Sequence, residues 1–189
     1  QELIEQFSLE RVSKSGAKFD YEKGKWFNHQ YLQLKSNEEL AEQFMPILDT
    51  KLSTLNTKPS LETVSKVIGL TKDRVNFVSE LWEQVNFFFV APTEYDEKSL
   101  KKRWKEDSPK HMTEMLALLE AHDDWSAEGL DNLIMPWIAE KEYGVGIVMN
   151  AFRICLVGAA RGPHIWNITD VLGKEETLAR VRTALEKLG

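Results

Sequence analysis

The residues best suited to chemistry lie between Gly144 and Glu176. There Arg153 interrupts an apolar run, and a Gly162-Pro163 corner follows before a final glycine-bounded helix. An arginine side chain presents a rigid, planar fork of hydrogen-bond donors, which suits it to binding rather than to nucleophilic or acid–base catalysis. The pattern therefore predicts a binding surface.

No catalytic or metal-binding constellation accompanies this stretch. The four histidines lie far apart and have no metal-ligand spacing with one another or with Cys155. His122 is followed by two aspartates, which we interpret as a solvated helix end before a Ser126 cap. Cys155 stands between two large apolar residues, as a small buried hydrophobe would. We expect no catalytic residue, no metal and no cofactor in this chain.

Two basic stretches contain aromatic residues among their lysines. Lys101 and Arg103 lie beside a tryptophan in one of them, where neighbouring acidic residues partly offset the charge. Lys14 and Lys18 precede a phenylalanine in the other. Both patterns fit contacts with nucleic-acid phosphates combined with base stacking, and both also fit a solvated helix face. The two interpretations stay open.

The bulk composition limits the remaining classes. The chain has 189 residues, of which 42% are apolar and 29% charged, as in a globular protein of one large or two small domains. No apolar run approaches the ~18 residues of a membrane span, and a single cysteine fits a reducing compartment. We expect a cytoplasmic protein without membrane contact. The net charge of −6 argues mildly against a strongly basic nucleic-acid binder.

Helical periodicity dominates the sequence and predicts an all-α fold. We expect a helix to open at Thr71, the run Phe87–Val90 to be buried, a central helix over Ile147–Val157, and the last helix to begin at Lys174. A proline break near residue 92 predicts two small helical domains. The expected helix N-caps include Asn37, Ser60 and Ser126.

Two passages carry a more specific pattern. The first contains Ser8-Leu-Glu-Arg-Val-Ser-Lys-Ser15, Phe19-Asp20 and Trp26-Phe-Asn28. The second, much later in the chain, contains Phe152-Arg153, Gly162-Pro163 and Leu172-Gly-Lys-Glu175. In this order they resemble the tRNA-binding, C-terminal region of bacterial glutamyl-tRNA synthetases, and the resemblance covers essentially the whole chain.

This resemblance implies a stem-contact-like helical domain and first anticodon-binding subdomain over residues 1–92, and a C-terminal helical anticodon-binding domain over 93–189. The parent would be a glutamate–tRNA ligase that uses ATP and Mg²⁺. This chain, which starts at Gln1 without an initiator methionine, would be a monomeric fragment that recognises the tRNA body and anticodon. Residues 12–15 imitate the Lys-Met-Ser-Lys-Ser signature of these enzymes. The family's own signature lies upstream, and so we expect no ATP site here.

The resemblance also assigns site residues. In the family, an arginine and a Gly-Pro loop approach anticodon bases, and the matching positions here are Arg153, Gly162, Pro163 and Ile165. We expect Ile165 and Trp166 to offer apolar or stacking faces to bases. Two structural alternatives remain open, in which Arg153 satisfies carbonyls at a helix C-terminus and the Gly-Pro corner is a plain turn.

This sequence departs from the family pattern at positions that affect the expected affinity for tRNA, and other functions remain open. Lysines that often flank the family's glycine are replaced by Val145 and Ile147 around Gly146, which removes expected phosphate contacts. Alternative functions are a helical protein–protein adaptor and the equivalent region of a glutaminyl or misacylating synthetase. The candidate contacts with the tRNA backbone are Lys14, Lys18, Lys101 and Arg103.

Overall fold

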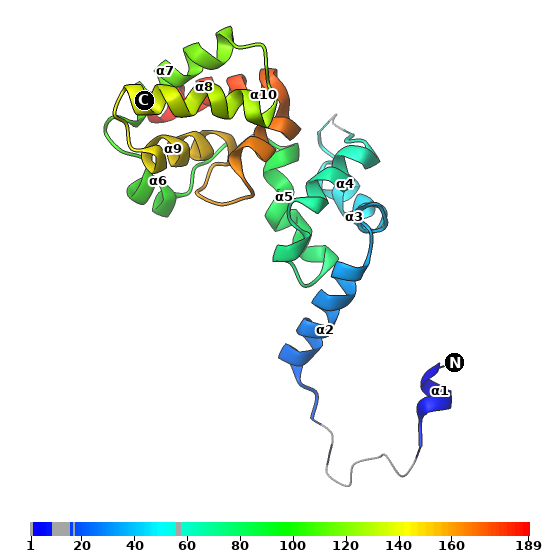
Figure 1. Ribbon diagram of the computed structural model, residues 1–189. Coiled ribbons are helices and arrows are strands. Elements are labelled where there is room, and N and C mark those ends of the chain that lie inside the picture. Colours follow the sequence, from blue (N-terminus) through cyan, green and yellow to red (C-terminus); the bar gives the residue numbers. More distant parts are fainter. Residues whose placement is uncertain (1, 9–15, 17, 56–57) are drawn as a thin grey trace.

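The protein is helical throughout the part that the structure describes. The computed structural model describes residues 2–8, 16, 18–55 and 58–189 (Figure 1), and these residues contain no strand, which confirms the all-α prediction. Among them, no helix has both the length and the apolar character needed to cross a bilayer. The helices are α1 (Glu2–Gln6), α2 (Tyr21–Leu34), α3 (Asn37–Lys51), α4 (Leu61–Gly69), α5 (Leu81–Phe89), α6 (Glu97–Arg103), α7 (Ser108–Ala121), α8 (Ala127–Glu140), α9 (Val145–Val157) and α10 (Ile165–Leu188).

Side-chain caps fix where several helices begin. The Ser36 hydroxyl accepts the Glu39 N–H at the start of α3, and the Glu39 carboxylate accepts the Ser36 N–H in return. Asn37, the expected cap, is instead the first helical residue. Ser60 and Ser126 cap α4 and α8 as predicted. Local capping chemistry therefore sets these boundaries to within one residue of the prediction.

The chain between α4 and α5 departs from the prediction. A helix that opens at Thr71 is wrong, because the segment forms two short 3-10 helices, η2 (Lys72–Arg74) and η3 (Val78–Glu80), with extended backbone between them. The Glu80 carboxylate accepts the backbone N–H groups of residues 76–77. This local bond satisfies donors that a continuous helix would otherwise pair.

The last helix is longer than predicted and sharply bent. α10 begins at Ile165, and Gly173 interrupts it with φ +77° and ψ 172°. Glycine reaches this conformation readily because it has no Cβ. The second half starts at Lys174, as expected, whereas the half before Gly173 was not predicted.

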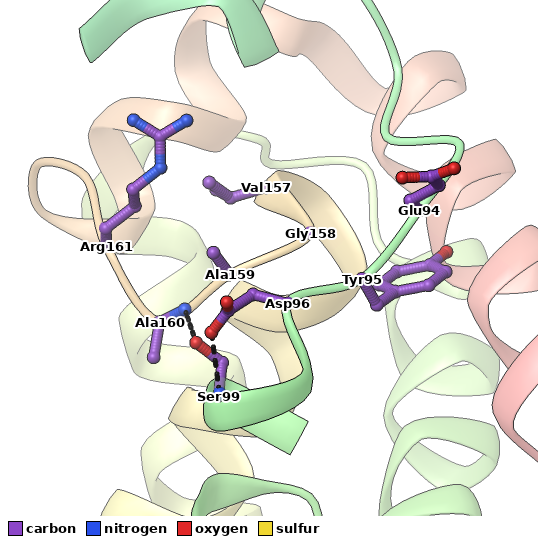
Figure 2. Close-up of a pocket in the computed structure, with 9 residues that line it drawn as sticks. All are labelled: Glu94, Tyr95, Asp96, Ser99, Val157, Gly158, Ala159, Ala160 and Arg161. Carbon is purple, nitrogen blue, oxygen red and sulfur yellow. Dashed lines mark hydrogen bonds between the residues drawn. The ribbon is translucent and has the colours of Figure 1, made fainter. Parts of the chain in front are cut away.

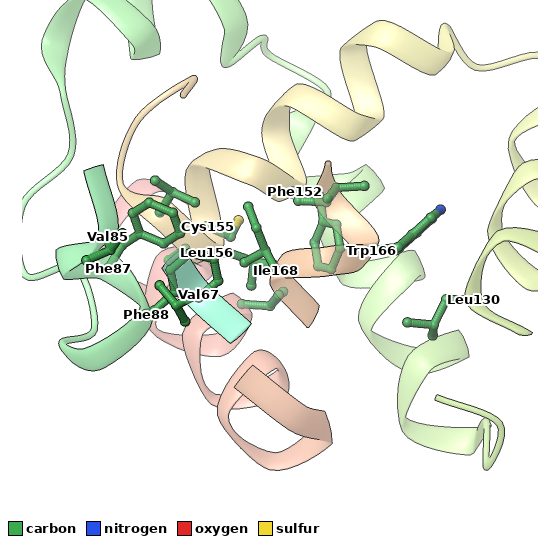
Figure 3. Packing of buried hydrophobic residues seen from close by; sticks show 14 of the residues in the cluster. Val67, Val85, Phe87, Phe88, Leu130, Phe152, Cys155, Leu156, Trp166 and Ile168 are labelled. Carbon is green, nitrogen blue, oxygen red and sulfur yellow. The ribbon is translucent and has the colours of Figure 1, made fainter. Parts of the chain in front are cut away.

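One hydrophobic core joins the two groups of helices. Val67 of α4, Phe87 of α5, Leu156 of α9 and Ile168 of α10 are all buried in the same cluster (Figure 3). The rings of Phe87 and Phe88 lie 4.4 Å apart and both are buried as predicted, whereas Phe89 and Val90 of the same run are only partly buried. In Figure 1, α5 lies between the helices that precede it and the group α6–α10. Helix α5 therefore contributes side chains to the core that both groups of helices share.

A buried arginine ties α10 to the other helices. Arg180 is only 4% exposed. Its Nη1 donates to the carbonyl oxygens of Phe87 at 2.6 Å and Leu156 at 2.7 Å, and its Nε donates to Glu176 Oε1 at 2.7 Å. One side chain thus joins the ends of α5 and α9 to the middle of α10.

Candidate nucleic-acid interface

Arg153 lies on α9 and binds the loop that leads from α9 to α10. Its Nη1 donates to the carbonyl oxygen of Pro163 at 2.6 Å and to that of Arg161 at 3.3 Å. The side chain is half-buried, and burial lowers its pKa, although an arginine remains charged at neutral pH. Arg153 therefore fixes the conformation of the following loop, rather than satisfying carbonyls at the end of its own helix.

The Gly162-Pro163 corner is closely packed on both sides. Gly162 has φ +110°, a region that side chains rarely adopt. A Cβ added there would lie 3.3 Å from Phe87 Cζ and 3.5 Å from Arg153 Nη1. Pro163 is buried, and its carbonyl accepts the bond from Arg153. The corner thus holds the loop against α5 and α9 at a position where only glycine fits without strain.

Arg161 docks the outer side of the same loop on α5. Its Nη1 donates to the carbonyl oxygen of Glu83, and its Nη2 donates to Asn86 Oδ1 at 3.3 Å. The guanidinium carbon lies 5.9 Å from the centroid of the Phe87 ring, a cation–π distance. No role was predicted for Arg161 from the sequence, although its place directly before the Gly-Pro corner was a usable signal.

Arg74 joins these residues from a distant part of the sequence. It is exposed at the end of η2. Its positive charge is the second cause, after burial, that lowers the pKa of Arg153. Arg74 therefore affects Arg153 through its charge, and the hydrogen bonds of Arg153 go to the loop carbonyl oxygens instead. The prediction missed Arg74 because it placed this segment inside a helix.

Arg74, Arg153 and Arg161 form what we call the arginine cluster. Within the described ranges, none of the three makes an ion pair with a carboxylate. Like charges held together without a counter-charge raise the local positive potential and favour a bound anion. The cluster therefore offers a local positive surface on a chain whose net charge is −6.

A hollow of about 510 Å³ opens beside the loop. Figure 2 shows it between the loop of residues 157–161 and the chain that leads into α6, with the Arg161 side chain at its edge. The Asp96 N–H donates to the Gly158 carbonyl at 2.8 Å, and the Ala160 N–H donates to Ser99 Oγ at 3.0 Å. These bonds hold the wall of the hollow, whose carbonyl and carboxylate oxygens can accept bonds from the amino groups of bases.

The remaining basic candidates lie in different places. Lys101 and Arg103 are exposed on α6, whose first turn holds the loop through Ser99. Lys18 is exposed just before α2, and Figure 1 shows α2 at the opposite end of the structure from the group α6–α10. Lys14 lies outside the described residues. The helix that carries Lys101 and Arg103 thus contacts the loop through its first turn, whereas Lys18 precedes α2.

The side chains expected to stack on bases belong to the core. Ile165 and Trp166 are both 3% exposed. Trp166 Nε1 donates to Asp131 Oδ1 at 2.7 Å, so its polar atom is already bonded. In this conformation neither residue presents a face to solvent, and both instead anchor the first turn of α10 behind the loop.

The start of α9 presents apolar rather than basic side chains. Val145 and Ile147 are both exposed there. This end of α9, opposite to the end that leads into the loop, therefore offers apolar side chains in place of the lysines of the family pattern. Electrostatic attraction has to come from the arginine cluster and from α6.

Cys155 and the histidines offer little chemistry to this surface. Cys155 is fully buried, and burial raises the pKa of its thiol to about 12. The thiolate needed for nucleophilic attack is therefore scarce at neutral pH. In the part of the chain that is described, no three His, Cys, Asp or Glu side chains are grouped so that they could hold a metal ion.

The chain is similar to known proteins over its whole length. It is 57% identical over 187 residues to the glutamate–tRNA ligase of Bacteroides fragilis and 56% identical to that of Bacteroides thetaiotaomicron. In both cases the match covers 99% of this chain and 36% of the relative. The crystal structure of a glutamate tRNA ligase from Elizabethkingia meningosepticum in complex with its amino acid matches with a TM-score of 0.84 at 39% identity, covering all of this chain and 36% of that one. The chain thus spans about a third of the length of its relatives.

A family model described as "Anticodon binding domain" matches residues 39–185, which is more than half of the chain. All three members of the arginine cluster lie inside this range. So do the Gly-Pro corner and the hollow beside it. On the strength of this match, the chain belongs to the family of anticodon binding domains.

Proposed function

We propose that this chain binds the anticodon arm of tRNA as the recognition part of a glutamate–tRNA ligase. The observation that carries the proposal is the arginine cluster, in which Arg153 of α9 and Arg161 of the following loop bind carbonyl oxygens and, among the described residues, pair with no carboxylate, on an otherwise acidic chain. RNA binding draws much of its affinity from phosphate neutralisation. Family membership supports the same ligand.

The three arginines have different roles in this proposal. Arg74 is exposed and carries the free charge that meets a phosphate or a base edge. Arg161 and Arg153 use donors to bind carbonyl oxygens of α5 and of the loop. They therefore shape the loop while their charges still attract RNA. Gly162 and Pro163 supply the turn, and Ile165 anchors it from the core.

The hollow beside the loop gives single-stranded bases a place to enter. Unstacked anticodon bases expose Watson–Crick edges, which side chains and backbone groups can bind. The carboxylates of Glu94 and Asp96 line the hollow next to backbone carbonyls. Lys101 and Arg103 on α6 extend the positive surface for neighbouring phosphates. Lys14 and Lys18 would contact the tRNA body further away.

The catalytic steps of the ligase belong to the remainder of the full-length protein. We propose that the parent joins glutamate to tRNA with ATP and Mg²⁺ and acts as a cytoplasmic monomer. The support is the similarity to glutamate–tRNA ligases, since the chain matches a segment that makes up 36% of the length of such a relative. The chain by itself would bind tRNA without aminoacylating it.

The test is a titration of the chain with a glutamate tRNA transcript across a range of salt concentrations. We expect saturable binding that weakens as salt rises, with log Kd linear in log salt. Arg74→Met removes one phosphate contact and should lower the slope by about 0.7 to 0.9. Arg182→Met, on the far part of α10, is the matched control and should leave the slope unchanged.

Two outcomes would reject parts of the proposal. Absence of binding at low salt would favour the protein–protein adaptor alternative. Equal affinity for glutamine and glutamate tRNA transcripts would favour a glutaminyl or misacylating parent. If Arg153→Met weakens binding in proportion to its loss of stability, its role is to hold the loop rather than to read a base.

A further inference from the structure

Helix α2 turns its polar side toward the rest of this chain. The side chains of Asn28, His29 and Gln33 bind backbone carbonyl oxygens of residues 72–76, with His29 Nδ1 2.8 Å and Gln33 Nε2 2.9 Å from their partners. Leu32 is the one buried residue of this helix. A surface helix normally turns its apolar face inward, so this arrangement is reversed.

The opposite side of α2 carries apolar side chains. Phe27, Tyr31 and Leu34 follow one another at the i, i+4, i+7 spacing of a single helix face, and they are 44%, 66% and 82% exposed. The Trp26 ring packs edge-on against Phe27, with centroids 5.0 Å apart. We call these four residues the α2 apolar surface. In Figure 1, α2 projects away from the other labelled helices of the chain, α1 aside.

The charges around this surface favour a protein partner over RNA. The sequence contains no charged residue from Trp26 to Leu34. Proteins that stack bases on aromatic side chains combine them with positive charges along the same groove. The two nearest upstream lysines are Lys25, which pairs with Glu22 at 3.4 Å, and Lys23, whose Nζ lies 5.8 Å from the Phe27 centroid in a single cation–π contact. A contiguous exposed apolar face of this kind marks a protein contact.

We infer that the α2 apolar surface packs against the part of the full-length ligase that precedes this chain. The relatives are almost three times as long as the chain, which matches 36% of each, and the match is to their C-terminal part. The remainder therefore joins the chain at its N-terminal end, where α2 lies. This inference requires the longer ligase proposed above, but it does not depend on how the chain binds RNA.

Hydroxyl-radical footprinting read by mass spectrometry tests the inference on the full-length ligase and on the 189-residue chain. Trp26, Phe27 and Tyr31 should be oxidised several-fold more slowly in the full-length ligase than in the chain. Val145 and Ile147, exposed apolar residues at the start of α9, are internal references and should be oxidised at equal rates in both.

Three results would overturn the inference. Equal oxidation of the α2 apolar surface in both proteins would mean that the preceding part does not cover it. Protection that appears in the 189-residue chain as its concentration rises would identify a second copy as the occupant. Protection of the full-length ligase only after addition of tRNA would identify RNA.

A substitution provides a second measurement. Tyr31→Lys should leave the unfolding midpoint of the 189-residue chain nearly unchanged, because Tyr31 is 66% exposed there. In the full-length ligase it should lower the midpoint clearly. Leu61→Lys, at an exposed position on α4, is the control and should act equally in both proteins. If Tyr31→Lys changes the unfolding midpoint of both proteins by the same small amount, the docking is refuted. That result would leave the tRNA-binding proposal standing, because the tRNA titration of the chain tests it separately.

Discussion

Replacement of Arg180 by methionine should destabilise the chain strongly. The substitution keeps most of the side-chain volume but removes three hydrogen bonds of 2.6 to 2.7 Å from a residue that is 4% exposed. The carbonyl groups of Phe87 and Leu156 would then lose a charged donor inside the core. Removal of one partner from a buried ion pair costs about 3–5 kcal/mol. Glu176 is half-exposed and can be rehydrated, and so we expect a value near the lower limit.

The matched control is Arg182→Met on the same helix. Arg182 pairs with Glu120 at 2.7 Å, but both side chains are about half exposed. Such surface pairs contribute about 0–1 kcal/mol. Urea unfolding followed by tryptophan fluorescence compares the two variants. With an m-value of about 1–3 kcal/mol per molar, Arg180→Met should lower the midpoint by roughly 1 M or more. Equal midpoints for the two variants would refute the role assigned to the buried arginine.

Three further predictions concern single residues. Gly162→Ala should lower the free energy of unfolding by about 1–3 kcal/mol and weaken tRNA binding, since φ is +110° and the new Cβ approaches Phe87. Gly146→Ala, in open space on α9, should instead raise the free energy of unfolding by up to about 1 kcal/mol. Thermal unfolding measures the stability of both variants, and the tRNA titration measures their binding. Ser60→Ala should lower the free energy of unfolding by about 1 kcal/mol, because the α4 cap is lost, and urea unfolding measures this change. Burial raises the pKa of Cys155 to about 12, so its folded thiol stays protonated up to strongly alkaline pH. Iodoacetamide at pH 8 should therefore modify it only in urea, and rapid modification of the native chain would contradict this.

The sequence predicted the features that depend on neighbours along the chain. Ser60 and Ser126 cap the helices they precede, because a cap needs only backbone groups two or three residues away. The burial of Phe87 and of Cys155 followed from their apolar surroundings in the sequence. The central helix was predicted two residues short at its start, at Ile147 instead of Val145.

Features that depend on contacts between distant segments could not be predicted in this way. The apolar spacing after Thr71 fits a helix, but Glu80 and the polar face of α2 bind the backbone there in another conformation. Arg74 joins the arginine cluster only because of that tertiary arrangement. The resemblance singled out Arg153 as a residue that approaches anticodon bases, which stays a prediction, and the bonds that Arg153 makes to loop carbonyls required the structure.

The hydrogen bonds of α10 also bear on the order in which the protein can assemble during synthesis. Arg180 bonds Phe87 across 93 residues, and Lys187 bonds Thr93 across 94. Arg74 and α5 therefore leave the ribosome long before the helix that completes their surroundings is made. Until then the core side of α5 lacks its partner and is available to chaperones or to aggregation. The RNA-binding surface proposed here would be among the last parts of the nascent chain to mature.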